Sequence, residues 1–481
     1  MPSFFSNKHT LAVACRYSLI LISLGGCLSE TSFPVRIDEI VYVQRTPDNA
    51  PRTTRAWLRH THARLRTLLP ADRRPTLLTE DLTDARGRAV DVFAHFRKWP
   101  GYLHTILGNF SGLADTARVT GSTTAIEQPA PSWSGFTDVW IPINDELKLS
   151  GRLGYATRDG EILSADCIVI MPGLFGDNIR LRARDIGQAL RSAGLHVLAL
   201  EFRGHGQTEA RYPNVYFNFG AREAGDLLAV SDWLEALPKV RHTGIIGFSW
   251  SSNIALMAAW EDGREDDDPS VSLRLAPYLR PRCGRTHFQA GILAMSPVLR
   301  FEELVDALDR PWPYADNPVL ATLQATVDDR ARRKNHPDVH GNIHKLIEYE
   351  FERSGLNYPG ATQDGYDYIR FLPYHGRPSG HKLQKARVPV LIIHGANDPL
   401  AFAQEIADFF EETTNPDVAG LILHGGGHDG FASYCRDYLY SMMFNFFDPV
   451  LGAAACQEEG TMVRREETPP PIGYEAITDV E

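Results

Sequence analysis

Three side chains that can together activate a nucleophile occur in this chain in a fixed order. Ser249 stands in the motif G-F-S-W-S, Asp398 in N-D-P, and His428 in G-G-G-H. A serine hydroxyl is a poor nucleophile at neutral pH, so it needs an imidazole to take its proton and a carboxylate to orient that imidazole. We therefore predict that Ser249 is a catalytic nucleophile, with His428 as its base and Asp398 behind the histidine.

The positions of the three residues along the chain favour this prediction. Each follows a short apolar run of the kind that forms a buried strand, at 244–248, 388–394 and 419–424. The carboxyl ends of parallel strands meet at one edge of a sheet, which is where sites form in open α/β folds. A serine in a tight turn between a strand and a helix is the arrangement of a nucleophile elbow, and it requires small neighbours. We expect the three side chains to converge at this edge.

Acyl transfer also needs backbone N–H groups aimed at the developing oxyanion. The residue after the nucleophile, Trp250, is expected to supply one of them. The turn M-P-G-L-F-G-D, after the first core strand, is expected to supply the second. Leu174 is the predicted donor in that turn, and Phe175 is the reserve.

Each candidate has an alternative without catalytic function. Ser249 could be an inert turn serine, and Asp398 could cap the helix that follows it. His428 has a rival in His424, which we expect to pack at the strand end instead. His336, His340 and His344 recur every four residues, as on a metal-binding helix face, but Pro337 and Gly341 interrupt that helix and favour a surface loop.

The pattern of elements predicts the α/β class, with a mostly parallel sheet flanked by helices. From residue 136 onward, short apolar runs alternate with helical stretches, as expected for parallel strands joined by crossover helices. Residues 300–386 interrupt the pattern and predict a helical cap insertion, since loops at the carboxyl edge of a sheet border pockets. The predicted strands are 137–143, 147–155, 167–173, 196–202, 244–249, 290–295, 388–394 and 419–424, and the predicted helices include 179–194, 218–237, 253–260 and 431–447.

The motifs resemble those of the α/β-hydrolase superfamily over about residues 136–450. The resemblance rests on P-G-L-F-G at 172–176, R-G-H-G at 203–206, the G-F-S elbow, the N-D-P turn and G-G-H-D-G-F at 426–431. These motifs are most similar to the YheT-like branch of predicted carboxylesterases and lipases. Ser251 and Ser252 stand where that branch has two glycines, and Pro172 stands where it has histidine. The resemblance implies an α/β-hydrolase fold and a serine esterase.

Composition excludes some classes of function. The formal net charge is −11 and the sequence pI is about 5.9. Binding to nucleic acid relies on an excess of lysine and arginine, so we predict no nucleic-acid partner. The six cysteines lack zinc-site spacing, and no metal or organic cofactor is implied. The acidic run at 261–268 is predicted to be solvated surface.

The two ends of the chain predict targeting and disorder. Residues 1–26 hold two basic residues and an apolar run too short to span a bilayer, which is typical of a signal peptide. Leu24-Gly-Gly-Cys27 resembles a bacterial lipoprotein box, so we expect lipidation of Cys27 and a membrane-anchored protein of the bacterial cell envelope. The alternative is a cytoplasmic enzyme. Residues 27–134 form an extension of unknown role, the catalytic domain spans 135–450, and 457–481 is predicted to be disordered.

The function predicted from these observations is hydrolysis of carboxylic esters through an acyl-enzyme, in the manner of an esterase or lipase, on a small-molecule or lipid ester. Acyl transfer, thioester hydrolysis or amide cleavage on the same triad is the alternative within enzymes. A catalytically inactive, envelope-anchored binding protein is the alternative outside them. The sequence predicts no oligomeric state.

Overall fold

The computed structural model describes most of the chain between Ser32 and Phe447. The signal-peptide and lipoprotein predictions for residues 1–27, and the disordered tail at 457–481, lie outside the described residues. Within the described part, none of the helices combines the length and the hydrophobicity needed to cross a membrane. The described residues are 32–43, 53–75, 116, 131–177, 180–281, 284–309, 318–336, 338–371 and 382–447.

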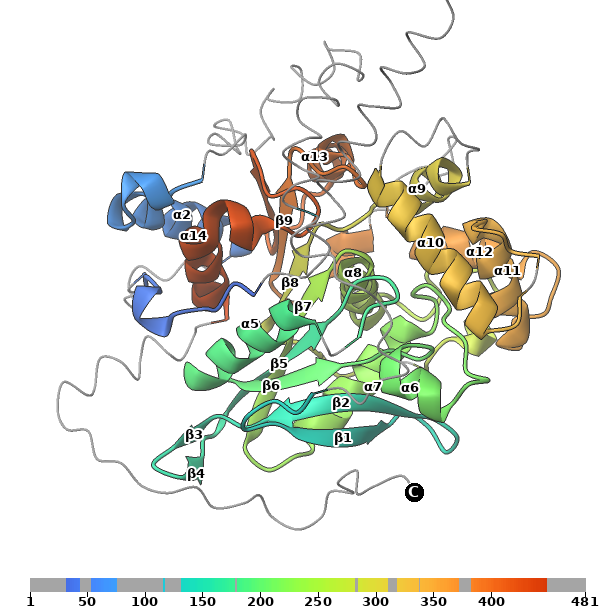
Figure 1. The fold of residues 1–481 in the computed structure, drawn as a ribbon, viewed down its shortest axis with the longest axis horizontal. Helices are drawn as coiled ribbons and strands as arrows, with labels where there is room; N and C mark the ends of the chain where they lie inside the picture. Colours follow the sequence, from blue (N-terminus) through green and yellow to red (C-terminus); the bar gives the residue numbers. More distant parts are fainter. Residues whose placement is uncertain are drawn as a thin grey trace, which may run out of the picture.

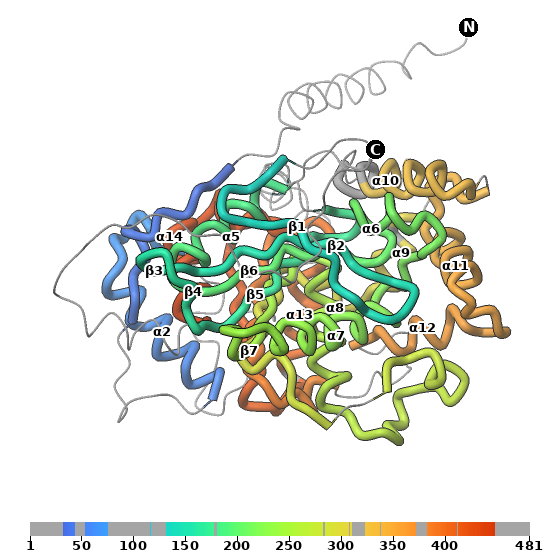
Figure 2. The backbone as a smooth tube through the Cα atoms, turned by 90° about the horizontal axis from the view of Figure 1, so that it is seen from below, coloured from blue at the N-terminus to red at the C-terminus, as the bar shows by residue number. Residues whose placement is uncertain are grey.

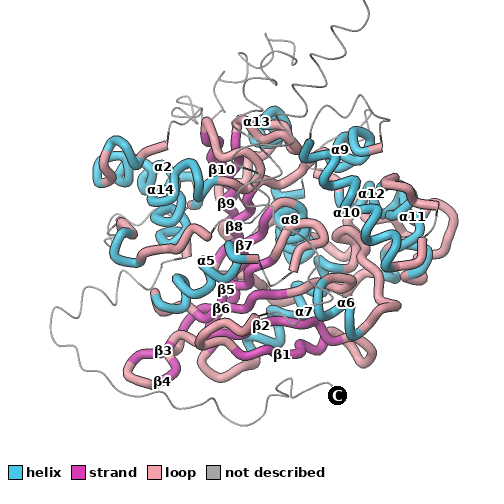
Figure 3. Tube along the Cα trace, viewed as in Figure 1, coloured by secondary structure: helices cyan, strands magenta, loops and turns pink. Residues whose placement is uncertain are grey.

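An eight-stranded sheet forms the centre of the molecule, with the strand order β1-β2-β6-β5-β7-β8-β9-β10 (Figures 1 and 3). The pairs β1–β2 and β2–β6 are antiparallel, and every later pair is parallel. This confirms the predicted fold class. The strands are β1 (Thr137–Pro142), β2 (Lys148–Gly154), β5 (Ala165–Met171), β6 (His196–Leu200), β7 (Val240–Phe248), β8 (Gly291–Met295), β9 (Val390–Gly395) and β10 (Val418–Leu423), with a separate hairpin of β3 (Thr157–Arg158) and β4 (Glu161–Ile162).

Helices cover both faces of the sheet. Strands β5, β6, β8, β9 and β10 are buried at every position without alternation, as expected when both faces of the sheet are covered. One hydrophobic cluster lies between the sheet and the helices α5 (Leu181–Ser192) and α14 (Phe431–Phe446). A second cluster lies between the other face and α7 (Glu223–Glu235), α8 (Trp250–Gly263) and α13 (Ala403–Glu412). The sheet therefore holds the carboxyl ends of its central strands at a fixed spacing.

The segment between β8 and β9 is helical, as the sequence predicted. It holds α9 (Phe301–Leu308), α10 (Pro318–Arg333), α11 (Ile343–Arg353) and α12 (Ala361–Ile369). These helices gather at one end of the molecule, and the N-terminal helix α2 (Thr54–Leu68) lies at the other end (Figure 2). We call residues 300–386 the insertion; its function as a cap remains a prediction.

The N-terminal segment packs on the main body, which the sequence did not predict. Helix α2 (Thr54–Leu68) contacts α14 and β10. Its Arg55 donates hydrogen bonds to the carbonyl oxygens of Val418 and Thr413, at 2.9 and 2.6 Å. Further upstream, the amide of Val43 donates to Asn445 Oδ1 at 2.8 Å. Part of the extension is therefore built into the main body of the protein.

Several local predictions need correction. Helix α7 begins at Glu223, later than predicted, because the Glu223 carboxylate accepts the N–H groups of Asn218 and Gly220 and holds a turn there. The sequence also did not predict α6 (Gly206–Arg211) as a helix.

The acidic run at 261–268 is only partly solvated, contrary to the prediction. Glu261 is buried and accepts two hydrogen bonds from Arg264, and Asp262 is buried against His287 Nδ1 at 2.6 Å. Asp268 is also buried, and it pairs with Lys385 at 2.6 Å. Acidic side chains are almost never fully buried unless they are paired, and each of these three has a basic partner. This run therefore connects the C-terminal end of α8 to His287 and Lys385.

Candidate active site

The structure brings the three predicted side chains together at the carboxyl ends of β7, β9 and β10. Ser249 Oγ lies 2.7 Å from His428 Nε2, and His428 Nδ1 lies 2.8 Å from Asp398 Oδ2. A carboxylate can only accept, so Nδ1 carries the proton and donates to Asp398. Nε2 is therefore free to accept the hydroxyl proton of Ser249. Asp398 and His428 are buried, and Ser249 is partly exposed.

Ser249 sits in a strained turn between β7 and α8. Its φ is 55° and its ψ is −123°, a conformation that is costly for a residue with a side chain. Gly247 is required in this turn, because a Cβ there would lie 2.8 Å from the backbone of Ser251 and Ser252. This conformation places the Ser249 hydroxyl beyond the end of β7, as in a nucleophile elbow.

Ser251, which stands in place of the usual glycine, is accommodated by hydrogen bonds. Its hydroxyl accepts the N–H of Phe248 at 2.7 Å and lies 3.0 Å from the carbonyl oxygen of Met171, at the end of β5. The neighbouring Ser252 donates to the carbonyl oxygen of Met295, at the end of β8, at 2.6 Å. The two hydroxyls thus join the elbow to the strands on both sides of β7.

Asp398 has two separate sets of partners. Oδ1 accepts the N–H groups of Leu400 and Ala401 at 2.8 and 3.0 Å, and Oδ2 faces His428. Helix α13 begins only at Ala403, so Asp398 holds its own turn and does not cap that helix. Burial alone would raise the pKa of Asp398, but His428 and the Ala401 amide lower it below its ordinary value. Asp398 is therefore a carboxylate at neutral pH.

The competing histidine, His424, is exposed at the end of β10, so it does not pack there as expected. The other histidine near the triad is His394, which is buried in β9 and lies 2.9 Å from the carbonyl oxygen of Ala401. Burial lowers the pKa of His394, so it is neutral. Of these three imidazoles, that of His428 is the one within hydrogen-bonding distance of Ser249.

The loop that carries His428 is held by side chains that sequence reasoning missed. Three consecutive N–H groups, those of residues 427, 428 and 429, each donate to a side-chain oxygen. The acceptors are Asn397 Oδ1 at 2.9 Å, Thr116 Oγ1 at 2.8 Å and Ser296 Oγ at 3.1 Å. Asn397 adjoins Asp398 and could have been suspected, whereas Thr116 and Ser296 carry no signal in the sequence.

The predicted oxyanion turn lies directly against the nucleophile. A Cβ added to Gly173 would lie 3.3 Å from Cβ of Ser249. The Phe175 amide, the reserve donor, already donates to His205 Nε2 at 3.1 Å. No described residue accepts the amide of Leu174, which is partly exposed. Trp250 is the first residue of α8, where the amide has no acceptor within the helix.

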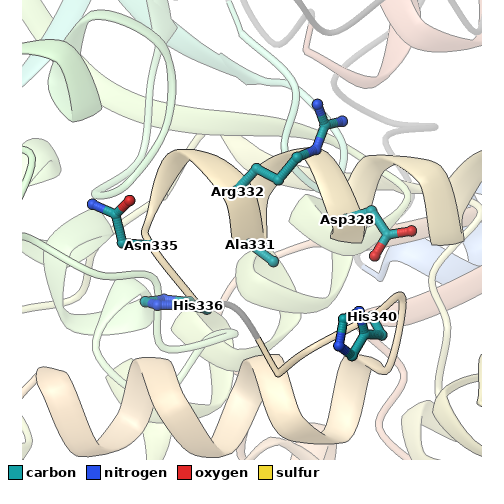
Figure 4. A pocket seen from close by; sticks show the side chains of 6 residues that line it. All are labelled: Asp328, Ala331, Arg332, Asn335, His336 and His340. Carbon is teal, nitrogen blue, oxygen red and sulfur yellow. The ribbon is translucent and has the colours of Figure 1, made fainter.

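The three histidines of the insertion do not share a helix face. His336 and His340 lie in the turn between α10 and α11, and His344 lies in α11, where it contacts Tyr366 and Asp306 at 3.1 Å. The described residues hold no cluster of three or more His, Cys, Asp or Glu side chains suited to a metal ion. A cavity of about 690 Å³ lies in this region (Figure 4), lined by Asp328, Ala331, Arg332, Asn335, His336 and His340.

Comparison with known proteins gives one family match. A model described as the alpha/beta hydrolase family matches residues 168–438, which is 438 − 168 + 1 = 271 of 481 residues. The match is to the family as a whole, so the YheT-like branch remains a prediction. No curated protein matches the chain in sequence.

Similar solved structures have low sequence identity to this chain. The esterase Pf2001 of Pyrococcus furiosus is 16% identical, with a TM-score of 0.41, and the match covers 66% of this chain and 96% of that one. The acylaminoacyl peptidase of Pyrococcus horikoshii is 14% identical, with a TM-score of 0.39 and coverage of 69% and 44%. Est1E of Butyrivibrio proteoclasticus is 13% identical, with a TM-score of 0.36 and coverage of 65% and 100%.

Proposed function

Because the chain belongs to the alpha/beta hydrolase family, we propose that it is a serine hydrolase that cleaves carboxylic esters through an acyl-enzyme. Family membership supports a hydrolase in general, and ester cleavage by Ser249 is the proposal. The observation that carries it is the chain of two hydrogen bonds, at 2.7 and 2.8 Å, from Ser249 through His428 to Asp398. This geometry supports a serine–histidine–acid triad.

In the proposed reaction, Ser249 Oγ bonds to the ester carbonyl carbon while His428 Nε2 takes its proton. The carbonyl oxygen becomes an oxyanion, and the tetrahedral intermediate then loses the alcohol, which leaves with the proton from His428. Water attacks the acyl-enzyme in the same way, with His428 again as base. The carboxylic acid is released and Ser249 regains its proton.

We assign the oxyanion donors to the N–H groups of Trp250 and Leu174. Three facts support Leu174 over Phe175: the Phe175 amide is engaged by His205, the Leu174 amide has no described acceptor, and the adjoining Gly173 packs on Ser249. Removing one such donor typically costs about 100- to 1,000-fold in kcat.

The charges around His428 suit a general base. Burial alone would lower its pKa, but the Asp398 carboxylate at 2.8 Å, with a contribution from Asp429, raises it above the ordinary value of 6.5. A base with a raised pKa takes the serine proton more readily, and it needs a correspondingly higher pH to be unprotonated. We expect hydrolysis to increase with pH on the acid side of its optimum.

A fluorophosphonate probe tests the proposal, because it labels activated serines. We expect wild-type protein to be labelled and the Ser249→Ala variant to remain unlabelled, with Ser192→Ala, at an exposed serine of α5, as the control. Folded wild-type protein that resists the probe would favour the inactive binding protein. Nitrophenyl esters of graded chain length, with matched thioesters, anilides and an alcohol acceptor, would separate the ester hydrolase from a thioesterase, an amidase and an acyltransferase.

For location, we propose a bacterial envelope lipoprotein that is lipidated on Cys27 and acts on small-molecule or lipid esters. The proposal rests on the sequence before residue 28. Expression of the full chain in a bacterium, followed by detergent partitioning, provides the test. Wild type should enter the detergent phase and Cys27→Ser the aqueous phase. Equal partitioning of both into the aqueous phase would favour the cytoplasmic alternative.

A further inference from the structure

Arg330 of the insertion reaches into the body of the hydrolase. Its side chain is fully buried, although it belongs to α10. Nη1 donates to the carbonyl oxygen of Gly204 at 2.6 Å, in the loop after β6. Nε and Nη2 form a two-pronged pair with the Glu350 carboxylate of α11, with Nη2 at 2.8 Å from Oε2. Two helices of the insertion thus bring a paired charge against the loop after β6.

The same guanidinium contacts the predicted oxyanion turn. Its Cζ lies over the ring of Phe175, 4.7 Å from the ring centroid. Phe175 has a φ of 55°, a strained value for a residue with a side chain, so the turn needs partners that hold it in this shape. Arg330 is one of these partners, acting through a cation–π contact.

His205 is the second partner of the turn, and Arg330 affects its charge. His205 Nε2 accepts the Phe175 amide at 3.1 Å, while Nδ1 donates to the carbonyl oxygen of Arg203 at 2.9 Å. An imidazole can accept only when it is neutral. Burial and the positive charge of Arg330 lower the pKa of His205 to about 3, so it stays neutral.

Glu350, the acidic member of the pair, contacts a residue that packs beside the turn, Phe217. Glu350 Oε2 accepts the amide of Phe217 at 2.9 Å, and the Phe217 ring packs against His205 with centroids 4.6 Å apart. Gly204 is needed for this packing, since a Cβ there would lie 2.8 Å from Arg330. Phe175 therefore packs against Arg330, His205 and Phe217, and Glu350 fixes the Phe217 backbone.

We infer that Arg330 is a positioning residue that couples the placement of the insertion to the shape of the turn at 172–176, and through it to the Leu174 amide. The inference rests on the proposed function, because the position of the Leu174 amide affects the rate only if that amide binds the oxyanion. It means that the insertion is fastened to the catalytic machinery at α10 and α11. A misplacement of about 1 Å in such a donor can cost up to roughly 100-fold in rate.

The test compares Arg330→Met and Arg330→Lys with Arg332→Met. Arg332 lies on the same helix, its side chain is 76% exposed, and its partner is Asp329 at 3.4 Å, so it is a matched control. Measurements are kcat, KM and the rate of Ser249 labelling by a fluorophosphonate, at a temperature where thermal melts show each protein folded. For Arg330→Met we expect kcat and the labelling rate to fall by roughly 10- to 100-fold. KM and the acid limb of the pH profile should change little, and the control should match wild type.

Several outcomes would overturn the inference. Folded Arg330→Met and Arg330→Lys with wild-type kcat and labelling rate, even with a lower Tm, would make the pair structural only. Should Arg330→Met fail to fold, Arg330→Lys decides, since lysine keeps the charge but cannot form the two-pronged pair. If both variants are unfolded, Arg330 is required for folding, and the inference of a positioning role is overturned. Failure of the proposed function is distinct, because wild-type protein would then neither label nor hydrolyse esters.

Discussion

Replacing Thr116 with valine should impair catalysis. Thr116 lies 312 residues before His428 in the chain, yet the two residues are in contact. The Thr116 hydroxyl is the acceptor for the His428 amide at 2.8 Å, and both residues are buried. Valine has nearly the same shape but no acceptor. The substitution therefore leaves a buried N–H group without that partner while changing little of the packing.

The size of the effect follows from the cost of an unmet hydrogen bond. A buried donor that loses its acceptor costs about 1–3 kcal/mol. If the loop relieves this cost by shifting His428 away from Ser249, the same energy appears in the barrier, and kcat/KM falls by about 5- to 150-fold. Thr116→Ser, which keeps the hydroxyl, should retain most of the activity.

The assay is hydrolysis of a short nitrophenyl ester by both variants, with urea unfolding as the measure of stability. Equal activity of wild type and Thr116→Val would refute the reasoning, because the His428 loop would then not depend on this acceptor. Equal losses in the valine and serine variants would also refute it, since the methyl group rather than the hydroxyl would then matter.

Three further predictions concern charge and hydrogen bonding. Asp398→Asn should lower kcat by about 10,000-fold and shift the acid limb of the pH–rate profile to lower pH, because the carboxylate that raises the pKa of His428 is gone while Asp429 and Arg182 remain. Ser251→Ala leaves the Phe248 amide without its acceptor, and urea unfolding should show a loss of about 1–3 kcal/mol. Burial raises the pKa of Glu405 from 4.5 to about 8. The stability that this group contributes is present in full below pH 4.5 and is lost as pH rises through 8, at up to about 1.4 kcal/mol per pH unit. Glu405→Gln should flatten that slope in urea unfolding, whereas an unchanged slope would contradict the assignment.

The sequence was informative where physical constraints leave a local pattern. Strands buried on both faces read as continuous apolar runs, so β5, β6, β8, β9 and β10 were predicted to within two residues of their observed bounds. The first four residues of β7, at 240–243, include polar side chains and were missed. Ser249, Asp398 and His428 follow three of these strands, and their order along the chain was enough to predict that they converge. The elbow was predicted for the same reason, since a strand-to-helix turn with glycine and serine is a local feature.

The sequence was uninformative where a contact joins distant segments through common side chains. Thr116 and Ser296 are ordinary hydroxyl residues that contact the His428 loop from 312 and 133 residues away. Arg330 reads as part of an exposed basic helix end, R-A-R-R, yet its side chain is fully buried. The acidic run at 261–268 was misjudged for a similar reason, because its partners Lys385 and His287 lie elsewhere in the chain.

The way in which the N-terminal segment docks limits how far the protein can lie from its proposed anchor. Ser32 Oγ donates to Asp185 of α5 at 2.6 Å, and the Phe33 amide donates to the same carboxylate at 3.1 Å. Five residue steps separate Cys27 from Ser32, and even a fully extended chain covers only about 18 Å over that length. A lipid on Cys27 would therefore be joined to the folded protein by a short tether, which would keep α5 close to the bilayer surface.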